Sequence, residues 1–239
     1  MRTVWRRIRV PLAVLVILAV VGAELSGHSF SGGRNWGLPA FGMVAAALLL
    51  MFWAFEEKRV SSREIAVIAV LSTLAAVSRI PFAFLPNLQP VTFIVVLSGY
   101  VFGARAGIMV GITAALVSNF FLGQGPWTPW QMFAWGTAGA TAGFLRFPPR
   151  FDRGGRVVCL FLWGYLFGWI MNLWFWTGFI RPLNWQTFLA TYLVSAWLDT
   201  FHAAGNVVFY LVFGERFTKI LLRFRKKLRV ESPAFPAAG

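Results

Sequence analysis

A few ionisable and amide side chains interrupt an otherwise apolar chain, and these are the groups that could do chemistry. Asp199 and His202 are three residues apart, so they share one face of a helix, and Asn206 continues that stripe. Asn119 and Asn172 stand in two further apolar stretches. Because such groups are costly to bury, they indicate interhelical hydrogen bonding, contact with a ligand or partner, or proton transfer.

Three segments between the apolar stretches carry a second set of candidate groups. Residues 79–90, 123–131 and 177–186 are rich in Pro, Trp, Asn and Gln and carry few charges. Pro and Gly restrict the backbone, so we expect fixed shapes whose aromatic faces and amides suit a small organic molecule. An interfacial belt is the alternative for any single Trp, but residues 124–131 as a whole favour a binding loop.

The candidate binding residues come from these three segments and from the apolar stretches beside them. Arg79 either reaches lipid headgroups or meets an anionic group of a ligand. The full set is Arg79, Phe82, Asn87, Gln89, Asn119, Gln124, Trp127, Thr128, Trp130, Gln131, Asn172, Trp176 and Arg181.

Several motifs that would indicate catalysis are missing from the sequence. There is no Gly-x-x-x-x-Gly-Lys-Ser/Thr run, no His-Glu-x-x-His and no Gly-x-Ser-x-Gly. The single cysteine, Cys159, excludes an internal disulfide and offers no metal cluster, so we expect neither a cofactor nor a metal. If the protein drives active transport, the energy has to come from another chain.

The elements that must position these residues are membrane helices. Of the 239 residues, 58% are hydrophobic and 13% charged, and the apolar residues form long continuous blocks. A β-barrel would instead need short alternating segments. The predicted helices span about 8–24, 36–55, 64–82, 90–104, 106–123, 127–146, 157–180 and 185–214. Val10–Ala23 has the shape of a signal peptide, but we interpret it as a retained first helix because no cleavage site follows.

These helices group into an all-α integral membrane protein with two parts and a tail. Residues 1–60 are predicted to form a two-helix N-terminal hairpin, residues 61–230 a six-helix core, and residues 231–239 a short cytoplasmic tail. Small residues line two of the core helices, either for packing within the fold or for contact with another membrane protein. These residues are Ala66, Ala69, Ser72, Thr73 and Ala76 in one helix and Gly107, Gly111, Ala114, Ala115 and Ser118 in the other.

The basic residues define a topology. The chain has 22 Lys and Arg residues and a net charge of +14, and only Arg34, Arg79 and Arg181 lie in the joints of one side. Since basic joints stay in the cytoplasm, both termini are predicted to be cytoplasmic. The charge is therefore a topology signal and does not indicate nucleic acid, although residues 219–229 are expected to contact anionic headgroups of the bilayer.

Residues 64–146 resemble the substrate-binding S-components of energy-coupling factor (ECF) transporters. The resemblance rests on five stretches: Arg79-Ile-Pro-Phe82, Gln89-Pro-Val-Thr92, Gly99-Tyr-Val-Phe-Gly103, Ser118-Asn119 and Gly123-Gln-Gly-Pro-Trp-Thr-Pro-Trp-Gln-Met132. The last stretch is the most specific, and the six-helix unit has the size that this family implies. Within the family, residues 79–132 are most similar to S-components for cobalamin or related corrinoids, with a queuosine precursor and pantothenate as alternatives.

The resemblance implies a substrate-capture subunit of a prokaryotic plasma membrane. Such a subunit binds a vitamin-like small molecule at its outer face, docks on a transmembrane T-component with two cytoplasmic ATPase subunits, and topples to release the substrate inside. The family often carries Ala-x-x-x-Ala on its first core helix. The nearest match here is Ala69-Val-Leu-Ser-Thr73, which with Ala66 would form the docking face.

Two other classes of protein remain open from the residues alone. One is a structural or assembly membrane protein whose aromatic loops bind a protein partner. The other is a membrane enzyme acting on lipids, for which Asp199 and His202 would be the acid–base pair. The hairpin 1–60 lies outside the common six-helix unit of the S-components.

Overall fold

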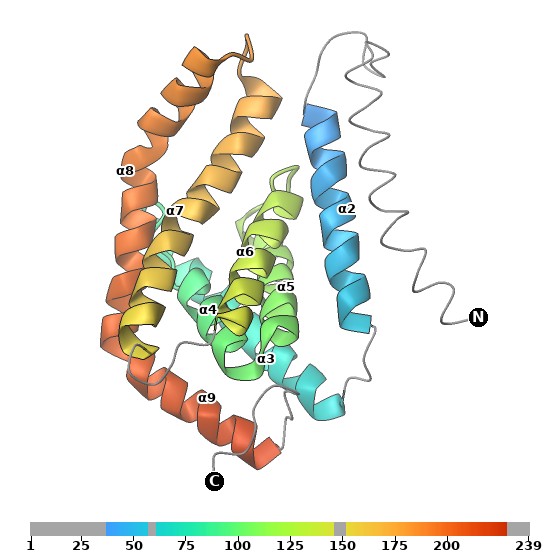
Figure 1. The fold of residues 1–239 in the computed structure, drawn as a ribbon, viewed down its shortest axis with the longest axis vertical. Helices are drawn as coiled ribbons and strands as arrows, with labels where there is room; N and C mark the ends of the chain where they lie inside the picture. The colour runs from blue at the N-terminus through green and yellow to red at the C-terminus, as the bar shows by residue number, and fades with distance from the viewer. Residues whose placement is uncertain (1–36, 57–60, 146–151, 229–239) are drawn as a thin grey trace, which may run out of the picture.

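The computed structural model describes residues 37–56, 61–145 and 152–228, and these ranges form helices joined by short connections (Figure 1). The predicted first helix at 8–24 and the predicted tail 231–239 lie outside the described residues. The helices are α2 (Gly37–Glu56), α3 (Ser62–Arg79), η1 (Ile80–Phe82), α4 (Val91–Phe102), α5 (Ala104–Leu122), α6 (Thr128–Phe144), α7 (Asp152–Phe179), α8 (Trp185–Phe209), η3 (Tyr210–Gly214) and α9 (Glu215–Leu228).

The predicted all-helical membrane fold is confirmed. Within the described ranges, three helical segments are long and apolar enough to cross a membrane, namely Ser62–Phe82, Ala104–Leu122 and Arg153–Phe179. The starts of α3, α5 and α7, which carry predicted cytoplasmic arginines, lie at the same end of the bundle in Figure 1. Two ion pairs at this end join Arg105 to Glu64 and Arg153 to Glu215.

The last predicted helix, 185–214, differs from the structure at its end. α8 stops at Phe209, a π-helical turn covers Tyr210–Gly214, and the chain continues as α9 at an angle to α8 (Figure 1). The prediction ended at Gly214 because the continuous apolar block ends there. The following residues alternate apolar and basic groups at helical spacing, so they form an amphipathic helix beyond the predicted end.

Helix α4 is the centre of the bundle. Every one of its residues except Tyr100 is buried, and α3, α5 and α6 pack around it. The joint to α5 is the single residue Gly103, whose φ of 92° is accessible to glycine at no steric cost. The very short joint predicted between these two helices is therefore present.

Helices α4, α5 and α6 cross at glycines that let their backbones touch. A Cβ at Gly139 would lie 2.1 Å from the carbonyl oxygen of Gly107, and a Cβ at Gly99 would lie 2.1 Å from that of Gly139. Such contacts are possible only without side chains. The small face of α5 is thus used inside the fold, which the sequence alone left open.

The small residues of α3 divide between two faces. Ser72 and Ala76 are buried against the bundle, whereas Ala66, Ala69 and Thr73 are exposed. The stripe predicted to dock a partner is therefore on the outer surface of α3.

Helix α2 packs along α5, α6 and α7 on one side of the core (Figure 1). Its Val44 and Leu48 are buried together with Ile112 of α5 and Trp130 of α6. The N-terminal addition thus contacts the helices that carry several of the candidate binding residues.

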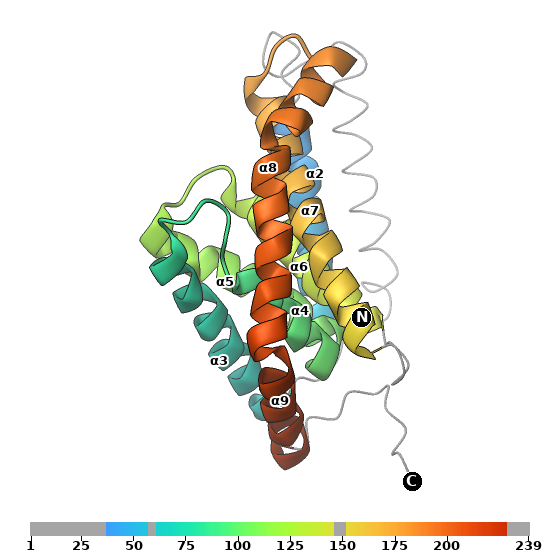
Figure 2. The same ribbon diagram turned by 90° about the vertical axis from the view of Figure 1, so that its left-hand side faces the viewer.

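Helices α7 and α8 form a long hairpin whose tip rises well beyond the far ends of α3–α6 in both views (Figures 1 and 2). Its tip is closed by an N-cap at Asn184, whose side chain accepts a hydrogen bond from the backbone of Thr187. The joint 180–184 therefore stands apart from the two other candidate loops.

The glycine crossing gives a test of the fold. Gly139→Ala should lower the free energy of unfolding by about 1–3 kcal/mol, because the new methyl group overlaps the backbone of α5. Thermal unfolding of the purified protein in detergent measures the change. Gly178→Ala is the control, since a Cβ there meets nothing within 4 Å. Equal melting temperatures for the two variants would contradict the close crossing.

Candidate functional site

The centre of the candidate site is Arg79, the last residue of α3. Its side chain is buried, with 6% of its surface exposed. Nε donates a hydrogen bond to Gln89 Oε1 at 2.8 Å, and Nη1 donates to Ser118 Oγ and to Asn119 Oδ1, the latter at 3.0 Å. Arg79 therefore joins the end of α3 to the connection before α4 and to α5.

Asn119 extends this network to α6. Its Nδ2 donates to Thr128 Oγ1 at 2.9 Å and to Gln131 Oε1 at 2.8 Å. Thr128 in turn donates to Gln124 Oε1 at 2.9 Å. Six residues predicted to bind substrate are thus brought into one hydrogen-bonded set, which we call the Arg79 network: Arg79, Gln89, Asn119, Gln124, Thr128 and Gln131.

An aromatic column crosses the bundle beside this network. The Arg79 guanidinium lies 4.8 Å from the ring centroid of Trp135, within cation–π range. Trp135 stacks on Phe167 of α7 at 4.6 Å, and Phe167 stacks on His202 of α8 at 5.1 Å. The column connects the guanidinium on α3 to the α7–α8 hairpin.

A second hydrogen-bonded chain runs along the column. Trp135 Nε1 donates to Thr92 Oγ1 at 2.9 Å, and Thr92 Oγ1 lies 2.9 Å from His202 Nε2. His202 Nδ1 lies 2.8 Å from the carbonyl oxygen of Asn87. Because a carbonyl only accepts, His202 Nδ1 carries a proton and donates to Asn87, while Nε2 shares a hydrogen bond with the Thr92 hydroxyl. His202 is thereby held at both ring nitrogens, and it orients the loop.

Asn87 shapes the connection between α3 and α4. Its φ is 59°, a left-handed conformation that Asn tolerates better than most residues. Its side-chain amide donates to the carbonyl oxygen of Leu198 at 3.2 Å. The loop is therefore fixed to α8 from both the backbone and the side chain of Asn87.

Asp199 belongs to a separate polar set between α7 and α8. Its Oδ2 accepts from Asn172 Nδ2 and from Ser195 Oγ, both at 3.3 Å, and 2% of the residue is exposed. Gly168 leaves the room for this carboxylate, since a Cβ there would lie 1.9 Å from Asp199 Oδ1. These contacts match interhelical hydrogen bonding, the first interpretation of the polar stripe.

Two of the candidate tryptophans lie near the network in different environments. Trp127 is partly exposed, and its ring meets the edge of Trp174 of α7 at 6.0 Å. Trp130 is 4% exposed and packs with Val44 and Leu48 of α2 and with Ile112 of α5. Trp127 is therefore the more accessible of the two rings, while Trp130 is part of the packed core.

The remaining candidates are not brought to the Arg79 network. Phe82 packs edge-on against Phe209 of α8 at 5.3 Å. Trp176 Nε1 donates to Thr187 Oγ1 at 3.0 Å, and Arg181 donates to the carbonyl oxygens of its own hairpin. Asn172, described above with Asp199, also lies on the hairpin.

Three residues of the site were missed by sequence reasoning: Thr92, Ser118 and Trp135. Helical spacing would have found Trp135, because Thr128, Gln131 and Trp135 form one stripe at intervals of three and four. Ser118 is the sequence neighbour of the candidate Asn119, near the end of α5. Thr92 carries no such signal, since its partners lie more than forty residues away in sequence.

The Arg79 guanidinium has only neutral hydrogen-bond partners among the described residues. The Nε and Nη1 hydrogens are all used by the three side chains named above, and no described carboxylate forms an ion pair with this arginine. Nη2 makes no hydrogen bond to any residue that the structure describes. An arginine has five N–H donors, so two remain for another molecule. In the described ranges, no group of His, Cys, Asp or Glu side chains is arranged to hold a metal.

Comparison with protein families identifies the class. Residues 63–222 match the family described as ECF transporter, substrate-specific component, so the chain belongs to this family. Its members are substrate-binding transport subunits rather than enzymes, and they pair with a T-component and ATPases. With its apolar helices, the chain is thus a multi-pass protein of a prokaryotic plasma membrane. Comparison with curated proteins and with solved structures gave no match.

Two substitutions separate the contribution of the Asn87 backbone conformation to stability from that of its side-chain hydrogen bond. Asn87→Gly keeps the left-handed conformation but loses the hydrogen bond to Leu198, whereas Asn87→Ala loses both. The alanine variant should be less stable than the glycine variant by about 1 kcal/mol, as measured by thermal unfolding. A glycine variant as unstable as the alanine variant would show that the conformation at this position contributes nothing.

Proposed function

We propose that the protein captures a vitamin-like micronutrient by an anionic group that binds Arg79. The observation that carries the proposal is the buried guanidinium whose described partners are all neutral. A buried charge without a counterion is costly, and an acidic ligand group would supply the missing charge and accept the two hydrogens of Nη2. The network itself is the positioning device, since it fixes the guanidinium from three sides.

The surroundings of Arg79 suit an organic molecule attached to that acidic group. Trp127 offers a partly exposed ring, and Gln124 and Gln131 offer amide groups in the same set. Aromatic faces with a few fixed polar groups are typical of small-molecule sites. The hairpin residues Trp176 and Arg181 would join the site only if the hairpin bends toward the loops when substrate binds.

The substrate proposed first is cobalamin or a related corrinoid, because residues 79–132 are similar to S-components for those compounds. A corrinoid with its nucleotide loop carries a phosphodiester, which is an acidic group for Arg79. Pantothenate carries a carboxylate and is the second candidate. A queuosine precursor, the third, has no acidic group and would leave the guanidinium without a counterion.

The same proposal assigns the other surfaces of the core, residues 61–230. Ala66, Ala69 and Thr73 are exposed on α3, as a docking face for the T-component requires. The two ATPases bound to that component would supply the energy, and toppling of the core would release the substrate. We place both termini in the cytoplasm, so that Arg79 lies at the external end, opposite the basic helix ends.

Binding to the isolated protein tests the proposal. The purified chain in detergent should be stabilised against heat by a corrinoid or by another micronutrient that carries an acidic group. A panel of corrinoids, pantothenate, folates, flavins, thiamine, biotin and queuine covers the candidates. Stabilisation by queuine alone would contradict the role of Arg79, and no stabilisation by any compound would contradict substrate capture.

Substitution of the arginine tests the site itself. Arg79→Gln should weaken binding of the stabilising ligand by about 10-fold or more, because a charged hydrogen bond is lost. Arg79→Lys keeps the charge and should retain part of the affinity. Isothermal titration measures both, with thermal unfolding as the check on folding.

The matched control is Arg153→Gln, which removes the same charge from an exposed ion pair at the opposite end of the bundle. Its affinity should equal that of the unsubstituted protein. Trp127→Ala should weaken binding without unfolding the protein, because the ring is partly exposed. If folded Arg79→Gln binds as tightly as Arg153→Gln, the acidic group does not bind at Arg79.

A further inference from the structure

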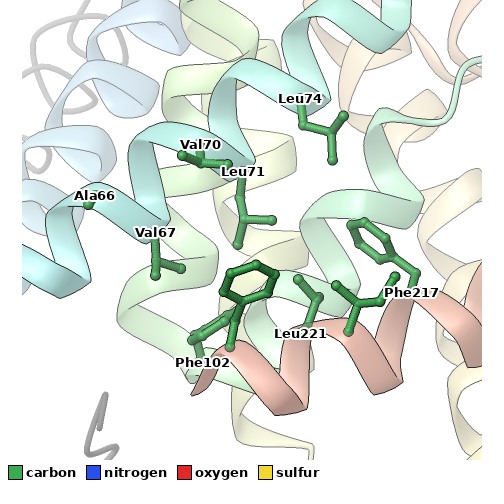
Figure 3. Close-up of a pocket in the computed structure, with 10 residues that line it drawn as sticks. Ala66, Val67, Val70, Leu71, Leu74, Phe102, Phe217 and Leu221 are labelled. Carbon is green, nitrogen blue, oxygen red and sulfur yellow. The ribbon is translucent and has the colours of Figure 1, made fainter. Parts of the chain in front are cut away.

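An apolar groove lies between α3 and α9 at the end of the bundle that carries the basic residues (Figure 3). Its volume is about 260 Å³. All ten lining residues are apolar, and α3, α9 and the end of α4 contribute them: Ala66, Val67, Val70, Leu71, Leu74, Phe102, Phe217, Ile220, Leu221 and Phe224.

The two helices run in opposite directions along this groove. In Figure 3, Leu74 lies toward Phe217 at the start of α9, whereas Val67 lies toward Phe102, nearer the later turns of α9. Helix α9 is held there by Arg225, whose Nη1 donates to the carbonyl oxygen of Val101 at 3.3 Å. The groove is thus a fixed feature of the fold, and its two walls come from segments far apart in sequence.

One rim of the groove is basic. The lining residues of α9 fall at intervals of three and four, so they form one stripe. Arg216, Arg223 and Lys227 follow the exposed edge of that stripe next to Ile220, and all three are exposed. On α3, Arg63 is exposed one turn before Ala66, so a further cation lies at the same mouth.

We propose that this groove binds an anionic phospholipid, with an acyl chain between α3 and α9 and the headgroup phosphate at Arg223 and Lys227. An apolar slot beside a row of cations matches the two parts of such a lipid. A lipid with a neutral zwitterionic headgroup matches only the slot. The proposal concerns the basic end of the bundle and does not depend on substrate capture at Arg79.

The cations beside the groove favour an anionic lipid over an apolar helix of a partner protein, because only the lipid brings a negative charge to Arg223 and Lys227. Because Ala66 belongs both to the groove and to the predicted docking face, a bound lipid would also border that face.

Lipid retention by the full-length protein tests the proposal. The protein is purified from detergent micelles that contain equal amounts of phosphatidylglycerol and phosphatidylcholine, and native mass spectrometry counts the lipids that remain bound. We expect one retained phosphatidylglycerol, with an occupancy at least about 10-fold above that of phosphatidylcholine. Equal retention of the two lipids would overturn the headgroup assignment.

Two pairs of charge reversals locate the headgroup. Arg223→Glu with Lys227→Glu should reduce phosphatidylglycerol retention about 10-fold or more. Lys219→Glu with Lys226→Glu changes the net charge equally at exposed positions of α9 that lie farther round the helix from the groove, and it should leave retention unchanged. Equal losses from both pairs would show diffuse attraction to α9 and would overturn a site at the groove.

A third comparison tests the slot without changing any charge. Val70→Trp places a large ring in the groove and should expel the lipid, whereas Val77→Trp adds the same ring on α3 outside it. Thermal unfolding shows whether each variant is folded. If folded Val70→Trp retains the lipid as well as Val77→Trp does, the acyl chain is not in the groove. If Val70→Trp loses only the binding of a T-component and keeps the lipid, the groove belongs to the protein partner.

Discussion

The burial of one guanidinium group sets the arrangement of the candidate site. Arg79 ends α3 with only 6% of its surface exposed, and the described residues offer it no carboxylate. Neutral side chains must therefore supply the hydrogen bonds. Gln89 comes from the connection before α4, and Ser118 and Asn119 come from α5. The convergence of these segments on a single group explains why amides gather at this end.

The rest of the fold holds these segments still. The glycine crossing at Gly99, Gly107 and Gly139 brings α4, α5 and α6 into backbone contact, so the helices that carry the network have little freedom to slide. The column of Trp135, Phe167 and His202 then fixes that unit to the α7–α8 hairpin. Because the Arg79 guanidinium is already held in place, it loses little conformational entropy when a ligand binds, and this favours tight binding.

The two ends of the bundle differ in the chemistry that they present. At one end, a single arginine is buried among amides and aromatic rings, and we propose that this combination binds a small molecule with an acidic group. At the other end, exposed cations lie along one rim of an apolar groove, and we propose that this combination binds an anionic lipid. An S-component needs both, because it must hold its substrate on one side while it stays embedded and accessible to a partner on the other.

The sequence predicted the helices well and the contacts between them less completely. Continuous apolar blocks define a membrane helix by length and composition, so α3, α5 and α7 were expected within a few residues. The continuation into α9 was missed because its apolar residues alternate with basic ones. Polar residues in the joints predicted five members of the Arg79 network, and Asn119 was predicted as an amide within an apolar stretch. Thr92 and the burial of Trp130 depend on helices distant in sequence, so local patterns do not reveal them.

The central claim is that Arg79 is the anchor for the acidic group of the substrate. An experimental structure of the protein with the ligand that stabilises it tests this claim most directly. The account predicts an acidic oxygen of the ligand within hydrogen-bonding distance of Arg79 Nη2, with the bonds to Gln89 and Asn119 intact. A ligand bound along the α7–α8 hairpin, away from an unchanged Arg79 network, would contradict it.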